Sequence, residues 1–213
     1  MRVPDHIGVI PDGNRRWAVQ HGFAKEQGYE LGIDPGLTLF HLCREAGVHE
    51  MTFYGFTTDN VKRPAEQRSA FSQACIQAVE LLSQENASLL VVGNSESPVF
   101  PKELRAFTTR QTFGKGGLNV NFLVNYGWEW DLSGLQPGAT SRKNVTSQLR
   151  SADVSRIDLI IRWGGRRRLS GFLPVQSVYA DFYVVDAYWP DFSPEHFVQA
   201  LKWYQSQDVT LGG

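Results

Sequence analysis

Short apolar runs alternate with longer amphipathic segments along this chain of 213 residues. The apolar runs cover residues 7–10, 51–56, 88–92, 118–124, 157–161 and 182–185. Most of them are too continuous for strands with one exposed face, which indicates strands buried in a parallel sheet. Helical patterns lie between them: one spans residues 64–82, and another opens at Asp34 and Pro35, an N-cap followed by a proline at the first helical position. The alternation predicts an α/β fold, a mostly parallel central sheet flanked by helices.

Polar clusters directly follow four of the predicted strands. They are residues 11–14 (PDGN), 57–60 (TTDN), 125–127 (NYG) and 162–165 (RWGG). Ligands in open α/β sheets bind beyond the carboxyl ends of the strands. We therefore expect the four clusters to form one site along that edge of the sheet.

The length of the chain allows one substantial core, and nothing in the composition calls for two. We expect a single domain over residues 1–213. Residues 133–153 are rich in Gly, Ser, Thr and Asn with little apolar periodicity, which predicts a loop within that domain.

Charge and cysteine content exclude several classes of function. Lys and Arg number 21 against 22 Asp and Glu, so there is no overall field for nucleic acid or an anionic membrane. Cys43 and Cys75 lie in apolar stretches without metal-ligand spacing, and we expect buried thiols. No apolar signal region opens the chain, and no run approaches the ~18 apolar residues that span a bilayer. We expect a cytoplasmic protein with no nucleic-acid partner and no transmembrane segment.

Residues 7–18 (IGVIPDGNRRWA) combine an apolar strand, a tight turn and a basic helix start. Gly13 allows a close turn, and Arg15 and Arg16 add full charges to the start of the following helix, so the segment suits a phosphate group. Asp12 would repel a diphosphate on its own. Its presence indicates a divalent cation between the carboxylate and the phosphate.

This segment resembles the N-terminal signature of the cis-prenyltransferases, the undecaprenyl diphosphate synthase family. Further similar blocks follow in the family's order: residues 53–60 (FYGFTTDN) with Arg63 and Pro64, residues 125–127, and in the C-terminal part residues 160–165 (IIRWGG), 168–170 (RLS), 179–183 (YADFY) and 189–192 (WPDF). Each block alone is a weak signal, but together and in order over almost the whole chain they are specific. The resemblance implies the cis-prenyltransferase α/β fold with an apolar tunnel, and a Mg²⁺-dependent prenyltransferase.

Such an enzyme ionises an allylic diphosphate, so its site must stabilise the departing diphosphate and keep water from an allylic cation. The resemblance gives catalytic roles to Asp12, Asn14, Arg16, Tyr29 and Asn60. We expect substrate contacts, some at positions where the chain departs from the family, from Gly13, Arg15, Trp17, Lys25, Arg63, Phe122, Arg162, Trp163, Arg168 and Ser170.

Two of these assignments are more specific. Arg162, Arg168 and Ser170 match the family residues that bind the diphosphate of isopentenyl diphosphate, the homoallylic acceptor, and guanidinium forks suit phosphate. Asp12 is the expected Mg²⁺ ligand, and Asp181 occupies the place of a metal-binding glutamate. We interpret the adjacent Arg166 and Arg167 as solvated charge.

The chain departs from the family pattern at functional positions. Lys25 replaces a phosphate-binding arginine and Tyr29 a histidine, while Val61 stands for a tryptophan and Gly171 for an asparagine. Residues 208–213 replace a segment that carries, in homodimeric relatives, an arginine reaching into the neighbouring acceptor site. Losing that guanidinium should weaken binding of isopentenyl diphosphate unless another subunit supplies it.

Three functions are compatible with these departures. The first is irregular coupling or cyclisation of short allylic diphosphates, as in the cyclolavandulyl diphosphate synthase branch, which this chain also resembles in Arg15 to Trp17, Tyr29 and Pro174. The second is regular cis-prenyl elongation with isopentenyl diphosphate. The third is a role as one subunit of a heteromer. The retained Asp12 argues against a purely non-catalytic subunit. A homodimer is the family expectation.

Bulky side chains favour a short product. Phe122 and its neighbours replace residues that are often small in long-chain relatives, and Trp128 and Trp163 stand where glycine and threonine are usual. Larger side chains leave less room in an apolar tunnel, although core packing is an equal interpretation for Phe122. An aromatic face at Trp163 could also stabilise an allylic cation. We expect dimethylallyl, geranyl or farnesyl diphosphate as substrate and a short, branched or cyclised terpenoid as product.

Overall fold

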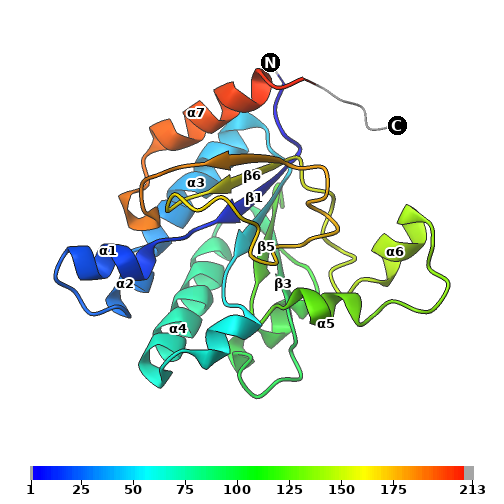
Figure 1. Ribbon diagram of the computed structural model, residues 1–213, viewed down its shortest axis with the longest axis horizontal. Helices are drawn as coiled ribbons and strands as arrows, with labels where there is room; N and C mark the ends of the chain where they lie inside the picture. The colour runs from blue at the N-terminus through cyan, green and yellow to red at the C-terminus, as the bar shows by residue number, and fades with distance from the viewer. Residues whose placement is uncertain (1, 209–213) are drawn as a thin grey trace.

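The computed structural model describes residues 2–208, which contain one seven-stranded sheet (Figure 1). The strands are β1 (His6–Ile10), β2 (Glu50–Tyr54), β3 (Ala87–Val92), β4 (Gln111–Phe113), β5 (Leu118–Leu123), β6 (Leu159–Arg162) and β7 (Asp181–Val184). Their spatial order is β4-β3-β5-β2-β1-β6-β7, and only β4 runs antiparallel to its neighbour. The predicted parallel sheet is confirmed. Strand β4 was not predicted because its three residues are largely exposed at the sheet edge and show no apolar alternation.

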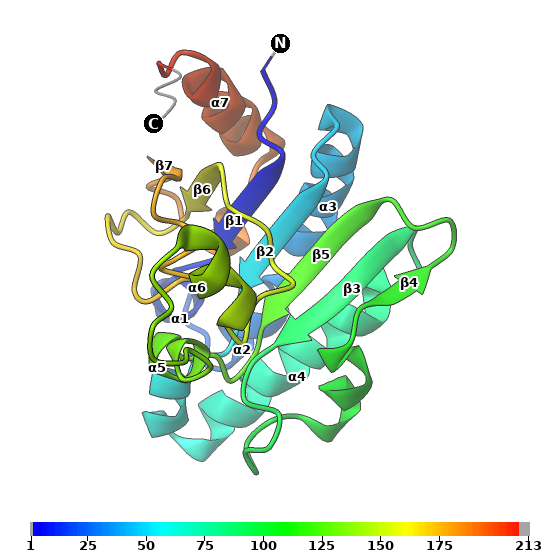
Figure 2. The ribbon, with the colours of Figure 1, turned by 90° about the vertical axis from the view of Figure 1, so that its right-hand side faces the viewer.

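Three long helices cover one face of the sheet, as Figures 1 and 2 show. They are α3 (Ile33–Ala46), α4 (Ala65–Leu82) and α7 (Pro194–Gln205). Their apolar stripes and the inward residues of the strands, such as Met51 and Phe53, form the main core. The opposite face carries α5 (Trp128–Leu132) and α6 (Arg142–Gln148), which lie toward its β6 side in Figure 2.

The remaining helices are short. They are α1 (Asn14–Gln20), α2 (Gln27–Glu30) and three 3₁₀ segments, η1 (Thr58–Lys62), η2 (Lys102–Thr108) and η3 (Trp189–Asp191). Helices α1 and α2 lie at the carboxyl edge of the sheet, where strand β1 delivers the chain into α1 (Figure 1). Within residues 2–208, no helix combines the length and the apolar character that crossing a bilayer requires.

Two local predictions were wrong. Helix α3 begins at Ile33 after an N-cap at Gly32, so Asp34 lies inside the first turn and does not cap the helix. A proline is tolerated anywhere in the first turn, and a carboxylate there is favourable beside the positive helix end. The predicted loop over residues 133–153 also contains α6, which Ser141 caps by accepting a hydrogen bond from the Asn144 amide. Val145 is the single apolar residue of this helix, so the helix shows no hydrophobic period.

Cys43 and Cys75 are buried free thiols, as expected. Burial raises the pKa of both, to about 12 for Cys75, so neither is a reactive thiolate near neutral pH.

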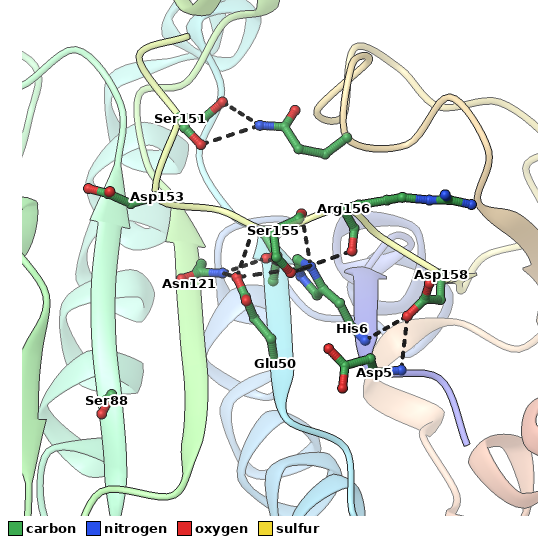
Figure 3. Close-up of polar contacts among 12 residues, drawn as sticks. Asp5, His6, Glu50, Ser88, Asn121, Ser151, Asp153, Ser155, Arg156 and Asp158 are labelled. Carbon is green, nitrogen blue, oxygen red and sulfur yellow. Dashed lines mark hydrogen bonds and ion pairs between the residues drawn. The ribbon is translucent and has the colours of Figure 1, made fainter. Parts of the chain in front are cut away.

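A buried polar network joins the amino-terminal halves of the central strands (Figure 3). The His6 Nε2 atom lies 2.8 Å from the Thr52 hydroxyl, and its Nδ1 atom lies 3.1 Å from the Ser155 carbonyl oxygen. The Asn121 amide donates to Thr52 and, at 2.6 Å, to the Glu50 carboxylate. Because these hydrogen bonds cross β1, β2 and β5, the network fixes the strands that carry the site at their other end.

The network makes stability depend on pH. Burial lowers the pKa of His6 below its ordinary value near 6.5, against the opposing pull of Glu50, so the folded protein holds His6 neutral. In the unfolded chain, His6 binds a proton as pH falls through about 6.5, whereas in the folded protein it stays neutral. The free energy of unfolding therefore decreases below that pH, by up to about 1.4 kcal/mol per pH unit. We expect urea unfolding at pH 7.5 and 5.5 to show this loss. His6→Gln should reduce it, whereas the exposed control His21→Gln should leave it unchanged.

Candidate active site

A polar cavity of about 920 Å³ opens at the carboxyl ends of β1, β2 and β6. The register places Ile10 of β1 beside Arg162 of β6, so the segments that follow the two strands leave the sheet together. The polar clusters after β1, β2 and β6 all contribute lining residues, as the sequence predicted. The cluster at residues 125–127 contributes none, because Asn125 and Tyr126 are buried.

The turn after β1 aims Asp12 into this cavity. The Asp12 amide donates to the Ile10 carbonyl at 2.9 Å, which closes the turn. Gly13 then adopts a φ of 111°, and a Cβ there would lie 2.6 Å from the Tyr188 ring, so this position requires glycine. Helix α1 has only seven residues, so the guanidinium groups that it carries supply most of the positive charge.

Asp12 sits between two guanidinium groups. Its Oδ2 atom lies 2.9 Å from Arg162 Nη2, and its Oδ1 atom lies 3.4 Å from Arg16 Nη2. The Asp12 side chain remains 33% exposed, whereas Arg162 is only 3% exposed. The carboxylate is therefore held in place while part of it faces the cavity.

Arg162 also holds the loop that follows β6. Its Nη1 atom donates to the Ser170 hydroxyl at 3.0 Å and to the Arg168 carbonyl oxygen. The Tyr54 hydroxyl donates to the Ser170 carbonyl oxygen at 2.6 Å, which fixes the same loop from β2. One guanidinium thus connects Asp12, in the turn after β1, with the residues predicted to bind the acceptor diphosphate.

A smaller apolar pocket of about 80 Å³ joins this region between β2, α3 and α4. Phe53, Leu37, Ala78, Leu82 and Phe122 are among its walls, so Phe122 lies in this pocket as predicted. The residues that line both spaces are Pro11, Asn14, Tyr29, Gly55 and Phe71. An apolar group in the small pocket would therefore meet an anionic group in the large cavity at this boundary.

Tyr29 is the polar group best placed at the boundary. Its hydroxyl accepts a hydrogen bond from Arg63 Nη1 at 2.8 Å, and its ring stacks on Phe71 with 4.5 Å between centroids. Burial raises the pKa of Tyr29, partly offset by the nearby charges of Arg63 and Arg15. The phenol therefore keeps its proton near neutral pH, and its O–H remains available to donate.

Asn14 lies beside Tyr29 at the boundary of the two spaces. Its Nδ2 atom donates to the Pro11 carbonyl at 2.9 Å, and within residues 2–208 its buried Oδ1 atom has no hydrogen-bond partner. A buried polar atom left without a partner is unusual in a folded protein.

Four other predicted residues keep to the rim or to local contacts. Arg15 reaches Gln67 on α4 at 3.2 Å and Lys25 is exposed, although both line the large cavity. Asn60 also lines the cavity, where its side chain accepts from the Thr57 amide. Trp17 lines neither space: its indole donates to Asp191 at 2.6 Å and stacks on His21 and Phe23.

The structure does not bring Trp163 or Asp181 to the cavity. Trp163 is fully buried between Trp189 and Phe192, so its ring is part of the core and not a wall beside the substrate. Asp181 opens β7 opposite Leu159, three residues before the position that pairs with Arg162, or about 10 Å along the strand. The site gathers at the carboxyl ends of the strands, and Asp181 lies at an amino end.

The donors present fit a magnesium ion held jointly with a substrate. Within the described part of the chain, no three His, Cys, Asp or Glu side chains are grouped as a metal cage. Mg²⁺ typically uses one or two carboxylates and completes its shell with water and substrate phosphate. The partly exposed Asp12 carboxylate can supply that single protein ligand.

Several lining residues, Tyr54 and Phe71 among them, were missed from the sequence. Tyr54 is the last residue of a strand that ends at the site, which is a signal that could have been used. Phe71 lies on α4, and only the packing of that helix on the sheet brings it to Tyr29.

Comparison with known proteins identifies the family. The model for the family described as "Putative undecaprenyl diphosphate synthase" matches residues 10–212. The chain is 30% identical to a ditrans,polycis-undecaprenyl-diphosphate synthase of Aliivibrio fischeri, over 99% of this chain and 89% of that protein. It is 31% identical to an isoprenyl transferase of Thermus thermophilus, over 99% and 89%.

Among solved structures, lavandulyl diphosphate synthase from Lavandula x intermedia, in complex with dimethylallyl diphosphate, has the same fold. The TM-score is 0.85 at 20% identity, over 99% of this chain and 98% of that one. With the family match over nearly all of its length, the chain belongs to the undecaprenyl diphosphate synthase family and is a prenyl diphosphate synthase of the cis-prenyltransferase type.

Proposed function

We propose that this prenyltransferase acts on a short allylic diphosphate, dimethylallyl diphosphate first of all, and couples it to a second prenyl diphosphate to give a short, irregular or cyclised terpenoid. The observation that carries the proposal is the junction of a small apolar pocket with a large cationic cavity at Tyr29 and Asn14. The fold neighbour that binds dimethylallyl diphosphate supports this choice of substrate class.

The size of the apolar pocket favours one prenyl unit. One water-sized group needs a cavity volume of about 10–15 Å³. The pocket of about 80 Å³ therefore has room for about five to eight such groups. One isoprene unit has five carbons. A geranyl or farnesyl chain would need Phe53, Phe122 or neighbouring side chains to move.

The residues around the junction would divide the chemistry between them. Arg63 and Arg16 bind the diphosphate of the allylic substrate, and their charge stabilises the electron pair that the breaking carbon–oxygen bond leaves on oxygen. Tyr29 donates its proton in a hydrogen bond to that oxygen. Magnesium held by Asp12 would neutralise further phosphate charge. Phe71 and the apolar walls exclude water from the allylic cation. The double bond of the second substrate attacks this cation to form the new carbon–carbon bond, and the resulting cation loses a proton, which the released diphosphate can accept.

Regular elongation with isopentenyl diphosphate remains the second candidate. The observation that favours it is the retained Arg162, Arg168 and Ser170 group, where the loop after β6 lines the cavity. Both candidates require a second diphosphate in the cavity, and they differ in whether that substrate is allylic or homoallylic.

Product analysis separates these candidates. Purified protein with Mg²⁺ is incubated with dimethylallyl, geranyl or farnesyl diphosphate, each with and without isopentenyl diphosphate, and products are identified by mass spectrometry. A new product from dimethylallyl diphosphate alone, abolished by EDTA, is the expected result. Product only with isopentenyl diphosphate would establish regular elongation. No product in any mixture would contradict the proposal and direct the search to a partner subunit.

The hydroxyl of Tyr29 should matter for turnover. We expect Tyr29→Phe to lower kcat about 10- to 100-fold, because a hydrogen bond to a developing charge contributes about 1.5–3 kcal/mol while the ring keeps its stack on Phe71. Steady-state rates with dimethylallyl diphosphate give the value. Tyr183→Phe, on β7 beside Trp203, is the matched control and should retain full activity. Equal rates for both variants would exclude Tyr29 from assisting the leaving group.

A further inference from the structure

The loop after β6 is fixed to the sheet at both ends. At its start, the amides of Gly164 and Gly165 donate to the carbonyls of Ala187 and Val185 at 2.8 and 3.1 Å. At its end, Arg162 and Tyr54 hold Ser170. These hydrogen bonds fix the backbone of the loop on both sides of the three consecutive arginines, residues 166–168.

The three arginines are not equivalent. Arg166 and Arg168 line the large polar cavity, and Arg167 does not. All three are exposed, and within residues 2–208 none of their guanidinium groups forms a hydrogen bond or an ion pair with another side chain. Arg166 is thus an exposed charge, as its sequence context indicates, and it lies on the cavity wall without an acidic partner.

The charge of the cavity exceeds what one substrate can balance. Its lining contains seven basic residues, Arg15, Arg16, Lys25, Arg63, Arg162, Arg166 and Arg168, against the two acidic residues Asp12 and Asp59. One diphosphate ester carries at most about three negative charges near neutral pH. The excess of basic residues suits two diphosphates, one at the Tyr29 and Arg63 boundary and one at the loop after β6.

We infer that Arg166 is a binding residue for the second diphosphate and acts with Arg162, Arg168 and Ser170. This inference rests on the proposed function, because it assigns a residue to the second substrate of the same site. In this inference, the Arg166 guanidinium of the same chain takes the place of the arginine that residues 208–213 lack. Residues 209–213 lie outside the described part of the chain.

Direct binding tests the inference without requiring turnover. One equivalent of dimethylallyl S-thiolodiphosphate, whose bridging sulfur replaces the oxygen that would leave, is first added with Mg²⁺ present, so that the analogue does not also fill the second diphosphate site. Inorganic diphosphate is then titrated by calorimetry into the wild-type protein, Arg166→Ala, Arg166→Lys and Arg167→Ala. Arg167→Ala removes the same charge from the next position of the same loop and is the matched control.

We expect Arg166→Ala to weaken binding of inorganic diphosphate at least about tenfold, because a charge-assisted hydrogen bond is lost. Arg167→Ala should change it less than about twofold, as expected for an exposed charge acting through solvent. Arg166→Lys should recover part of the affinity as a point charge. Equal effects of Arg166→Ala and Arg167→Ala, or no diphosphate binding to the protein loaded with one equivalent of analogue, would overturn the inference.

The outcome is separable from that of the proposed function. A selective loss in Arg166→Ala, in a protein that yields no prenyl product, would uphold the second diphosphate site while the proposed reaction fails. Product formation without a selective loss of diphosphate affinity in Arg166→Ala would refute only the role of Arg166 and would leave the proposed function standing.

Discussion

Asp12→Asn should lower kcat by at least about 10²- to 10³-fold, corresponding to about 2.7–4 kcal/mol of lost transition-state stabilisation. The asparagine keeps the shape of the side chain and one oxygen that can accept from Arg162, so the turn after β1 should persist. It removes the negative charge that balances Arg16 and Arg162 and that a magnesium ion would require. The loss should appear in kcat at saturating dimethylallyl diphosphate and Mg²⁺.

Two measurements make this result specific to Asp12. The thermal midpoint of Asp12→Asn reports whether removing one partner of the buried Arg162 has destabilised the fold. Asp5→Asn is the control, because Asp5 pairs with His49 on the surface, where both side chains are mostly exposed and little stability or activity depends on the pair. A folded Asp12→Asn variant with more than about a tenth of wild-type kcat would contradict the assignment of Asp12.

The central sheet could be predicted because strands β1, β2, β3, β5 and β6 are buried on both faces. Runs such as residues 7–10 (IGVI) and 88–92 (SLLVV) are almost continuously apolar, which few other local structures require. Strand β4 and helix α6 lie outside the core, at the sheet edge and on the surface, and their sequences are polar. Their pairing or capping determines their structure, and that information is not in the hydrophobic pattern.

The sequence could predict which residues lie at the mouth of the site, but it could not predict which residues are buried behind the cavity or lie away from it. Asp12 follows β1 and Arg162 ends β6 at the expected edge, so topology alone brings them together. Tyr29 lies on α2, and only the family resemblance predicted it there. The burial of Trp163 is different, because η3 and its flanking residues supply Trp189 and Phe192 from far along the chain to cover its ring. Likewise, the position of Asp181 at the start of β7 follows from strand register, which residue spacing alone left undetermined.

Arg162→Lys should reduce kcat/KM for the second diphosphate substrate by at least about 100-fold. The two Nη atoms of Arg162 reach Asp12 in one direction and Ser170 and the Arg168 carbonyl in the other. A lysine ammonium is one point charge on a flexible chain, so it can serve one side of this fork at a time. Loss of the loop contacts should raise KM for the second substrate, and loss of the Asp12 contact should lower kcat.

The double variant Asp12→Asn with Arg162→Lys distinguishes a joint role from two separate ones. If the pair acts as a unit, the kcat of the double variant should lie within about threefold of the kcat of the slower single variant, because each substitution already breaks the same contact. Arg44→Lys, in the exposed pair with Glu85, controls for the arginine-to-lysine change and should leave kcat and KM unchanged. Fully multiplicative losses in a protein whose thermal midpoint is preserved would show that Arg162 binds the second diphosphate independently of Asp12. The connection that the structure draws from β1 through Arg162 to the loop after β6 would then have no part in turnover.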